Sequence, residues 1–437
     1  MNKKININFL IIVVLFGVWL LPLMQNKFQF VTLDKLGGIS VDQEDTVLTF
    51  DSWFNGRYAE KKQIFLNDSF GFREIAIRFQ DQIQYSLYKK ANAQDVIVGK
   101  KNYLYELKYI KAFYGIDYIG SNKINEKVRK LKFIQDTLKK LNKTFIFLIA
   151  PTKASFYPEY IPDGYKVDSS KSNYEEFKPL LVKNGINYID YNQMFINQKN
   201  TSKYPLYPVA GIHWTEYGTY IAMDSLTKFI EDHTDFILPK LDYTHNIKVT
   251  DAYMGADNDM GRALNLLIAP DYGKLAYPEV RYVEPKYIHK PKVLTVADSY
   301  WMRLYYTQIP RNLFEKHSFW YYYSISYDYD NETEGKTPSD LDLRKELMKQ
   351  DVICIMSTET NLKSIGWRFV EDCYELFKNG KLDETERKRQ IRIEKCRLNL
   401  WDQDVSFKGI KKIAKKEKKS IDSVALAMAT YLVDTQK

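Results

Sequence analysis

Short apolar runs alternate with segments of helical periodicity through the middle of the chain. Five apolar runs predict buried strands, at residues 144–149, 186–189, 293–296, 319–323 and 352–356. Apolar residues at helical spacing predict helices between them, over residues 124–141, 174–183, 216–230 and 341–348 and from about residue 300. This alternation is typical of βαβ units, so we predict an α/β fold with a parallel sheet and helices on both faces.

A longer apolar stretch lies near the N-terminus. No charged residue occurs between Lys4 and Lys27, and residues 9–24 are apolar, which matches the roughly 20 residues that cross a bilayer. No small-residue cleavage site follows, so an uncleaved signal anchor is favoured over a cleaved signal peptide. Lys3 and Lys4 would hold the N-terminus in the cytoplasm. We therefore expect a single-pass protein of the inner membrane with its main domain in the periplasm.

The net charge of +9 is unevenly distributed. Residues 1–27 carry +3 and residues 381–437 carry +6, so residues 28–380 are neutral as a whole. A neutral main domain excludes the broad basic surface that nucleic acid requires. We predict three parts: an anchor with its flank at residues 1–30, an α/β domain at 31–380, and a basic tail of two or three helices at 381–437. Residues 28–67 are expected to be irregular, with aromatic anchors.

Two stretches contain candidate catalytic residues. Ser299 follows a predicted strand and begins a helix, where backbone amides can stabilise the oxyanion that forms when a serine attacks an ester. The alternative is a simple helix cap. His213 lies two residues before Thr215, which is expected to cap the next helix. A serine nucleophile needs such a base, because its hydroxyl is a weak nucleophile at neutral pH.

Together these stretches resemble the SGNH-hydrolase-like domain of the AlgX/AlgJ alginate O-acetyltransferase family. That family has a D-x-H-W motif before a helix and a G-D-S motif after a later strand, and the counterparts here are 211–214 (Gly-Ile-His-Trp) and 297–299 (Ala-Asp-Ser). Three further segments are similar to the family, in the same order: residues 67–73, residues 96–105, and residues 150–162 with Ala150-Pro-Thr-Lys153. The resemblance implies an SGNH-hydrolase-like, flavodoxin-like fold.

The resemblance also implies a mechanism and partners. Ser299 would be acylated, His213 would carry the proton, and the Ser299 N–H would contribute to the oxyanion hole. An acetyl group, passed across the membrane by a membrane-bound O-acyltransferase, would be transferred to a polysaccharide. We assign no cofactor and no metal, since no cysteine and histidine spacing resembles a zinc site. The three cysteines imply no disulfide framework.

One departure from the family bears on the mechanism. The family's triad aspartate, two residues before the histidine, is Gly211 here. Glu216 is the nearest carboxylate that would replace it. Two alternatives would equally account for Gly211: a Ser-His dyad in which a backbone carbonyl orients the histidine, or a domain that binds without catalysis. Asp298 and Asn361 are candidates for oxyanion or loop support. Candidates for substrate binding are Lys153, Tyr300 and Arg303, each with an ordinary packing or solvated alternative.

The sequence does not distinguish between an acetyltransferase, an acetyl esterase and a binding subunit. An acetyl esterase would use the same Ser299 and His213, because transferase and esterase share the acyl-enzyme and differ only in the acceptor. A sugar-binding or assembly subunit that kept the fold is the non-enzymatic alternative. The polysaccharide is left unnamed, since a neutral main domain gives no support for acidic alginate as the acceptor.

Overall fold

A computed structural model describes residues 7–38, 46–167 and 171–435. Lys3 and Lys4, on which the predicted orientation rests, lie outside these residues. The chain forms two compact units: residues 1–98 with 259–271, and residues 99–258 with 272–437. The three-part division expected from the sequence stays a prediction.

The first unit is helical. It contains the helices and the short strand α1 (Ile7–Phe28), α2 (Phe50–Phe54), α3 (Arg57–Asp68), α4 (Arg73–Tyr88), β1 (Val96–Val98) and α11 (Asp259–Ala263). Helix α1 has 22 residues and a mean hydropathy of 2.6 in its most apolar window, so its length and composition suffice to cross a membrane. Residues 28–67 were expected to be irregular, and within them α2 and most of α3 are helical; Thr49 and Ser52 form a capping box at the start of α2.

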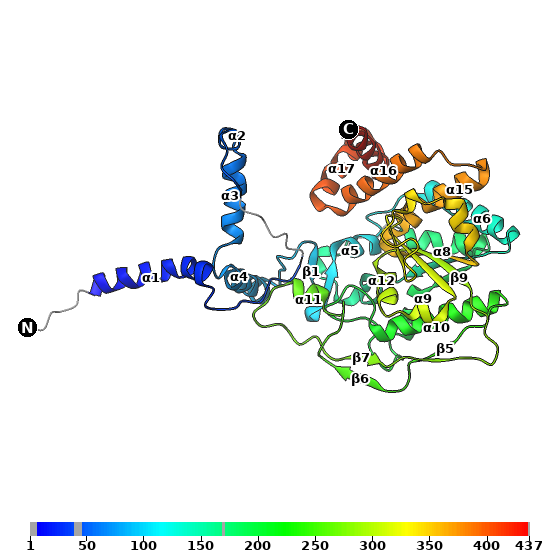
Figure 1. The fold of residues 1–437 in the computed structure, drawn as a ribbon, viewed down its shortest axis with the longest axis horizontal. Coiled ribbons are helices and arrows are strands. Elements are labelled where there is room, and N and C mark those ends of the chain that lie inside the picture. Colours follow the sequence, from blue (N-terminus) through cyan, green and yellow to red (C-terminus); the bar gives the residue numbers. More distant parts are fainter. Residues whose placement is uncertain (1–6, 39–45, 168–170, 436–437) are drawn as a thin grey trace, which may run out of the picture. The chain divides into compact units, whose positions relative to one another are not determined.

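The second unit is built around a six-stranded sheet with the strand order β11-β10-β9-β12-β3-β4 (Figure 1). Its strands are β3 (Thr144–Ala150), β4 (Tyr188–Asp190), β9 (Lys292–Ala297), β10 (Lys316–Tyr321), β11 (Ile325–Asp328) and β12 (Val352–Thr358). The five strands predicted from the sequence are parallel to one another, which confirms the α/β class.

The sheet is covered on both faces. Side chains of β3, β9 and β12 pack in one apolar core with α6 (Ser121–Lys140), α8 (Asn173–Lys183), α14 (Leu343–Lys349) and α15 (Phe369–Asn379). Helices α9 (Tyr191–Gln198), α10 (Glu216–His233) and α12 (Ser299–Tyr306) do not contribute to that core, and α9 and α12 contact β3 and β10. Phe145, Phe147 and Ile149 belong to the first core and alternate with the equally buried Ile146 and Leu148, as expected for a strand with both faces buried.

The edge of the sheet beside β10 differs from the prediction. The strand predicted at residues 319–323 begins at Lys316 and ends at Tyr321, because Tyr322 and Tyr323 adopt φ values of 49° and 52° and turn the chain. The following β11 pairs with β10 in antiparallel orientation. The sheet is therefore mainly rather than wholly parallel. The turn at Tyr322 brings this residue to the carboxyl end of β9, where its N–H donates to the Ala297 carbonyl at 2.9 Å.

Shorter elements connect these layers. They are η1 (Lys100–Asn102), β2 (Leu104–Glu106), α5 (Leu107–Phe113), α7 (Lys153–Phe156), η2 (Pro158–Tyr160), η3 (Asp163–Tyr165), α13 (Ile309–Leu313), η4 (Pro338–Asp340) and η5 (Glu359–Arg368). Two small antiparallel sheets pair β5 (Lys240–Asp242) with β8 (Arg281–Val283), and β6 (Ile247–Thr250) with β7 (Leu275–Pro278).

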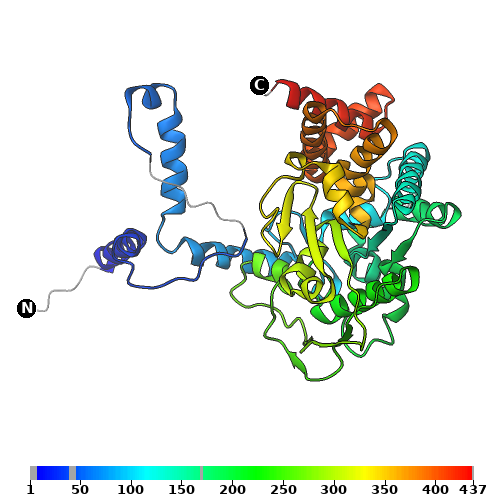
Figure 2. The same ribbon diagram turned by 45° about the vertical axis from the view of Figure 1, so that its right-hand side comes forward.

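The tail forms three helices, α16 (Glu384–Asp402), α17 (Asp404–Glu417) and α18 (Ile421–Thr435), drawn in orange to red in Figure 2. The expected cap is present, since the Ser420 hydroxyl accepts from the Ser423 N–H. Helix α16 is anchored to the sheet layer: its Arg387 is buried and donates to Asp372 of α15 and to the hydroxyl of Tyr323. The three helices belong to the second unit.

Candidate active site

The structure brings the two candidate catalytic side chains together. Ser299 is the first residue of α12, directly after β9, and His213 lies three residues before α10. The Nε2 atom of His213 lies 3.0 Å from the Oγ atom of Ser299, although 86 residues separate them in the chain. Both residues are partly exposed. This geometry lets His213 take the serine proton, and reactants can reach the pair.

Asp298 supports the loop that carries Ser299. Its side chain is buried and accepts three hydrogen bonds, from the backbone N–H groups of Tyr300 and Thr358 at 3.1 and 2.8 Å and from the Asn361 amide at 2.8 Å. These bonds tie the start of α12 to the end of β12. The loop-bracing role expected for Asp298 therefore has a direct structural basis.

Asn361 belongs to the same support. Its Nδ2 atom has two hydrogens, and it donates to Asp298 Oδ2 at 2.8 Å and to Thr358 Oγ1 at 2.9 Å. With both hydrogens engaged, the Asn361 amide holds Asp298 in place. Of the two roles considered for Asn361, loop support fits this arrangement and a direct bond to an oxyanion does not.

Tyr300 and Arg303 form hydrogen bonds to the loop that carries His213. The fully buried Tyr300 hydroxyl donates to the Ile212 carbonyl at 3.0 Å, and its ring packs edge-on against the His213 ring at 4.8 Å. Arg303 donates to the Trp214 carbonyl at 2.9 Å, so the residues on both sides of His213 are bonded to α12. In this arrangement both side chains bond to the loop that carries His213, and their predicted role in substrate binding stays a prediction.

The carboxylate of Glu216 lies in the network around Arg303. Its Oε1 accepts from the Tyr220 hydroxyl at 2.8 Å, and its Oε2 lies 3.8 Å from Arg303. The closest ionic partner of Arg303 is Asp257, whose side chain is completely buried. Asp257 was not singled out from the sequence, since it lies in a loop without any motif. Glu216 as the orienting acid of His213 stays a prediction.

Lys153 is buried, and its ammonium group bonds to backbone carbonyls. Its Nζ donates to the backbone carbonyls of Leu104 and Val209, each at 3.0 Å. Only 1% of the residue is exposed. The solvated lysine considered from the sequence does not fit this position, because the ammonium group joins β2 to the loop at Val209; the substrate-binding role stays a prediction.

Gly211 occupies a site with no room for a side chain. A Cβ atom built there would lie 2.7 Å from the Ala256 carbonyl oxygen, 2.8 Å from the Asp257 carbonyl oxygen and 2.8 Å from Pro208 Cγ. Real Cβ atoms do not approach other atoms this closely. The loss of the family's aspartate is therefore accompanied by a loop that closes over its position.

Tyr322 is a site residue that the sequence pattern assigned only to a strand. Burial raises the pKa of Tyr322 well above its usual range, and the nearby Asp298 carboxylate acts in the same direction. The phenol therefore stays protonated beside the candidate nucleophile. No local signal in the sequence marked it, because the pattern at 319–323 predicts a strand through this residue and only the turn at Tyr322 brings it to the carboxyl end of β9.

Residues 96–281 match the family model described as SGNH hydrolase-like domain, acetyltransferase AlgX. The matched range contains His213 and ends before Ser299, so the placement of Ser299 rests on the structure. A comparison with curated protein sequences gives no match.

Several solved structures are similar in fold. The O-acetyltransferase domain of Pseudomonas putida AlgJ is 16% identical, with a TM-score of 0.43, over 65% of this chain and 99% of that chain. Pseudomonas aeruginosa AlgX is 12% identical, with a TM-score of 0.41, over 70% of this chain and 71% of that chain. Bacillus cereus PatB1 is 11% identical, with a TM-score of 0.36, over 55% of this chain and 90% of that chain.

The mainly parallel sheet, with Ser299 and His213 at its carboxyl edge, fits the SGNH hydrolase-like domain that the family model describes. The similarity over residues 96–281 agrees with the AlgX/AlgJ resemblance predicted from the ordered motifs, and the family model describes an acetyltransferase.

Proposed function

We propose that this protein is a membrane-anchored O-acetyltransferase that acetylates a polysaccharide outside the cytoplasm, with Ser299 as nucleophile and His213 as base. The observation that carries the proposal is the 3.0 Å contact between His213 Nε2 and Ser299 Oγ within an AlgX/AlgJ-like acetyltransferase domain. The apolar helix α1 supports anchoring by its length and composition. The acetyl donor would be supplied through a membrane-bound O-acyltransferase.

The reaction proceeds through an acetyl-serine. Ser299 Oγ attacks the acetyl carbonyl carbon while its proton passes to His213 Nε2, and the donor leaves with that proton as its bond to the acetyl group breaks. An acceptor hydroxyl then gives its proton to His213 and attacks the acetyl-serine. A new ester forms, and the proton returns from His213 to Ser299. The Ser299 N–H at the start of α12 stabilises the oxyanion in both steps.

The loop contacts fix this geometry before substrate binds. Asp298 receives three donors, and the residues flanking His213 are bonded to Tyr300 and Arg303 of α12. The nucleophile and the base are thus attached to the same helix, which keeps their separation constant during the two acyl-transfer steps. Pre-organisation of this kind lowers the barrier because little rearrangement is needed when the oxyanion forms.

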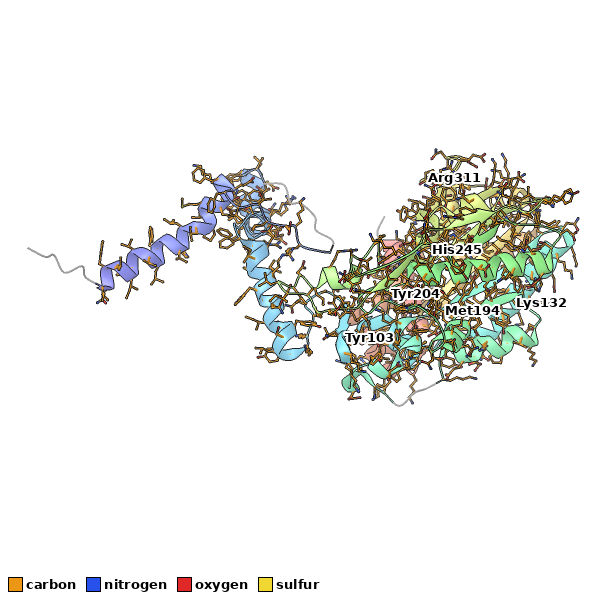
Figure 3. The ribbon with its side chains drawn as sticks, turned by 90° about the horizontal axis from the view of Figure 1, so that it is seen from below. Tyr103, Lys132, Met194, Tyr204, His245 and Arg311 are labelled. Carbon is orange, nitrogen blue, oxygen red and sulfur yellow. The ribbon has the colours of Figure 1, made fainter. Side chains whose placement is uncertain are left out.

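The test uses the purified full-length protein in detergent with p-nitrophenyl acetate as donor. We expect nitrophenol release and an acetyl group on the peptide that contains Ser299, found by mass spectrometry after acid quenching. Ser299→Ala and His213→Gln should each lower the rate by about 10³-fold or more. His245→Gln is the matched control, because His245 is exposed and paired with Asp242 on the small β5–β8 sheet (Figure 3).

Two results would contradict the proposal. Equal rates for wild type and Ser299→Ala would remove Ser299 as the nucleophile. Release of acetate to water, with no transfer to any added glycan, would instead make the protein an acetyl esterase that uses the same pair.

A further inference from the structure

A cavity of about 280 Å³ lies near the carboxyl end of β9, and one of its walls is the C-terminal helix α16. Tyr322, Asn361 and Trp367 line it from the sheet side. The Tyr322 N–H donates to the Ala297 carbonyl at 2.9 Å, and the Asn361 amide donates to Asp298 at 2.8 Å, so two lining residues are bonded to the two residues that precede Ser299. A molecule in this cavity therefore lies close to the loop that carries Ser299.

The backbone is strained where the cavity wall is made. Gly366, Trp367 and Arg368 are three consecutive residues with positive φ, at 70°, 49° and 88°. Non-glycine residues in this region cost about 1–3 kcal/mol each, and such strain concentrates at binding and catalytic sites. Here it places the Trp367 ring edge-on against the Tyr322 ring, at 4.9 Å.

Trp367 also has an unused donor. Only 3% of the residue is exposed, and its Nε1 atom is buried without a hydrogen-bond partner among the described residues. A buried indole N–H normally has a partner, because leaving it unpaired costs about 1–3 kcal/mol. A hydroxyl group bound in the cavity would supply that partner.

Charges around the cavity are balanced. Lys108 and Lys395 face Glu394 and Asp402, which gives no net charge. Lys108 lies 3.2 Å from Glu106, and Glu394 lies 2.6 Å from Arg397, so one cation and one anion of the cavity are already paired. Burial lowers the pKa of Lys108, and the carboxylates of Glu106 and Asp402 outweigh that effect and raise it, so Lys108 stays charged. The lining side chains therefore carry no net charge that would select a carboxylate ligand.

The remaining lining suits a sugar ring. The side chains of Asn361, Asn399 and Tyr322 supply amide and hydroxyl groups, while Trp367 and Leu398 supply apolar surface. Pockets for drug-sized ligands measure about 300–1,000 Å³, so a cavity of about 280 Å³ accommodates a single ring.

We infer that this cavity is an acceptor subsite for one uncharged sugar residue and that α16 forms its outer wall. The inference rests on the proposed function and adds to it the chemical class of the acceptor. The bound sugar directs a hydroxyl group to acetyl-Ser299, and Trp367 Nε1 donates to a second hydroxyl. Helix α16 is held for this role by Arg387, and by Lys363, whose Nζ lies 3.4 Å from Asp402.

The experiment compares two tryptophan substitutions on α16 in the full-length protein. Lys395 lines the cavity and Arg392 does not, and both are exposed cations on the same helix, so Lys395→Trp and Arg392→Trp are matched. Acetyl transfer is measured with neutral gluco-, galacto- and manno-oligosaccharides and with oligouronates, using p-nitrophenyl acetate as donor. We expect transfer to at least one neutral oligosaccharide, and we expect Lys395→Trp to lower the ratio of transfer to ester cleavage by about tenfold. Arg392→Trp should leave this ratio unchanged.

A second variant tests the indole donor. Trp367→Phe keeps an aromatic ring and loses Nε1, so it should raise KM for the neutral acceptor several-fold more than it lowers kcat. Equal ratios in the Lys395→Trp and Arg392→Trp proteins would overturn the subsite, as would a preference for oligouronates or no binding of any neutral oligosaccharide by calorimetry. These results are separate from the failure of the proposed function, which Ser299→Ala reports through ester cleavage alone.

Discussion

Gly211→Asp would restore the carboxylate that the family carries two residues before its histidine, and we expect it to damage this protein. The cause is the closed loop around Gly211, where a Cβ atom would lie 2.7 and 2.8 Å from the carbonyl oxygens of Ala256 and Asp257. Ordinary contacts of such atoms begin at about 3.4 Å, so backbone on both sides must move by about 0.6 Å.

The cost can be divided into two contributions. Overpacking by the Cβ atom alone should cost about 1–3 kcal/mol, which is the expectation for Gly211→Ala. The aspartate adds a carboxylate beside two carbonyl oxygens that cannot donate to it, at a further cost of about 1–3 kcal/mol. We therefore expect Gly211→Asp to lose about 2–6 kcal/mol and to lower Tm by roughly 2 °C per kcal/mol in a domain of this size. Ester cleavage should fall with it, because the histidine loop shifts.

The assay is thermal unfolding together with p-nitrophenyl acetate cleavage in the full-length protein. Gly164→Asp is the matched control, because nothing lies within 4 Å of a Cβ at Gly164 and the residue is exposed. The reasoning is refuted if Gly211→Asp unfolds at the wild-type temperature and cleaves ester faster. That outcome would mean that the loop opens at little cost and that the missing carboxylate limits the wild-type enzyme.

Three further predictions follow from buried charges. Burial raises the pKa of Glu359 to about 8, so the folded protein binds the Glu359 proton more tightly than the unfolded chain does. The free energy of unfolding should therefore fall by up to about 3 kcal/mol from pH 5 to pH 8. Denaturant titrations of Glu359→Gln should lack this fall. Arg387→Met leaves the buried Asp372 carboxylate with one ionic partner fewer and should cost about 3–5 kcal/mol by urea unfolding, whereas Arg389→Met, which removes a half-exposed pair with Asp434, should change little; equal effects would contradict the anchoring of α16 by Arg387. Truncation after Gly380 should yield aggregated protein by size-exclusion chromatography, because it removes Arg387 and uncovers the apolar core; a monodisperse, active product would show that the C-terminal helices are dispensable.

The alternation of apolar runs and helical periodicity predicted the main layers correctly. Residues 352–356 form a short run without a polar side chain, and a strand buried on both faces is the simplest structure for such a run. Residues 173–183 form a helix as expected, because Ser172 and Glu175 make a capping box at its start. Prediction failed where the conformation depends on neighbours, as at Tyr322 and Tyr323, whose positive φ values end β10 earlier than their β-propensity indicates.

The sequence singled out Ser299 and His213, which lie together in the structure, and did not single out several residues around them. Ser299 and His213 carry local signals, because each lies at a strand or helix boundary with a recognisable motif. Tyr322, Trp367 and Asp257 carry none, since their positions depend on contacts with residues far away in the chain. Lys153 shows the converse error: its position after a strand indicated exposure, and the surrounding loops enclose it.

The sequence by itself determined the elements, the apolar N-terminal helix and the two motifs, because periodicity, capping and hydrophobic length are local properties. The tertiary structure decided which motifs meet. The strand order β10-β9-β12-β3 differs from the chain order, and it places residues 213, 299, 322 and 361 in one region. It also decided that the position of the family's aspartate is closed and that α16 is a wall of the cavity close to the loop that carries Ser299. Both depend on packing between distant segments, which no local pattern records.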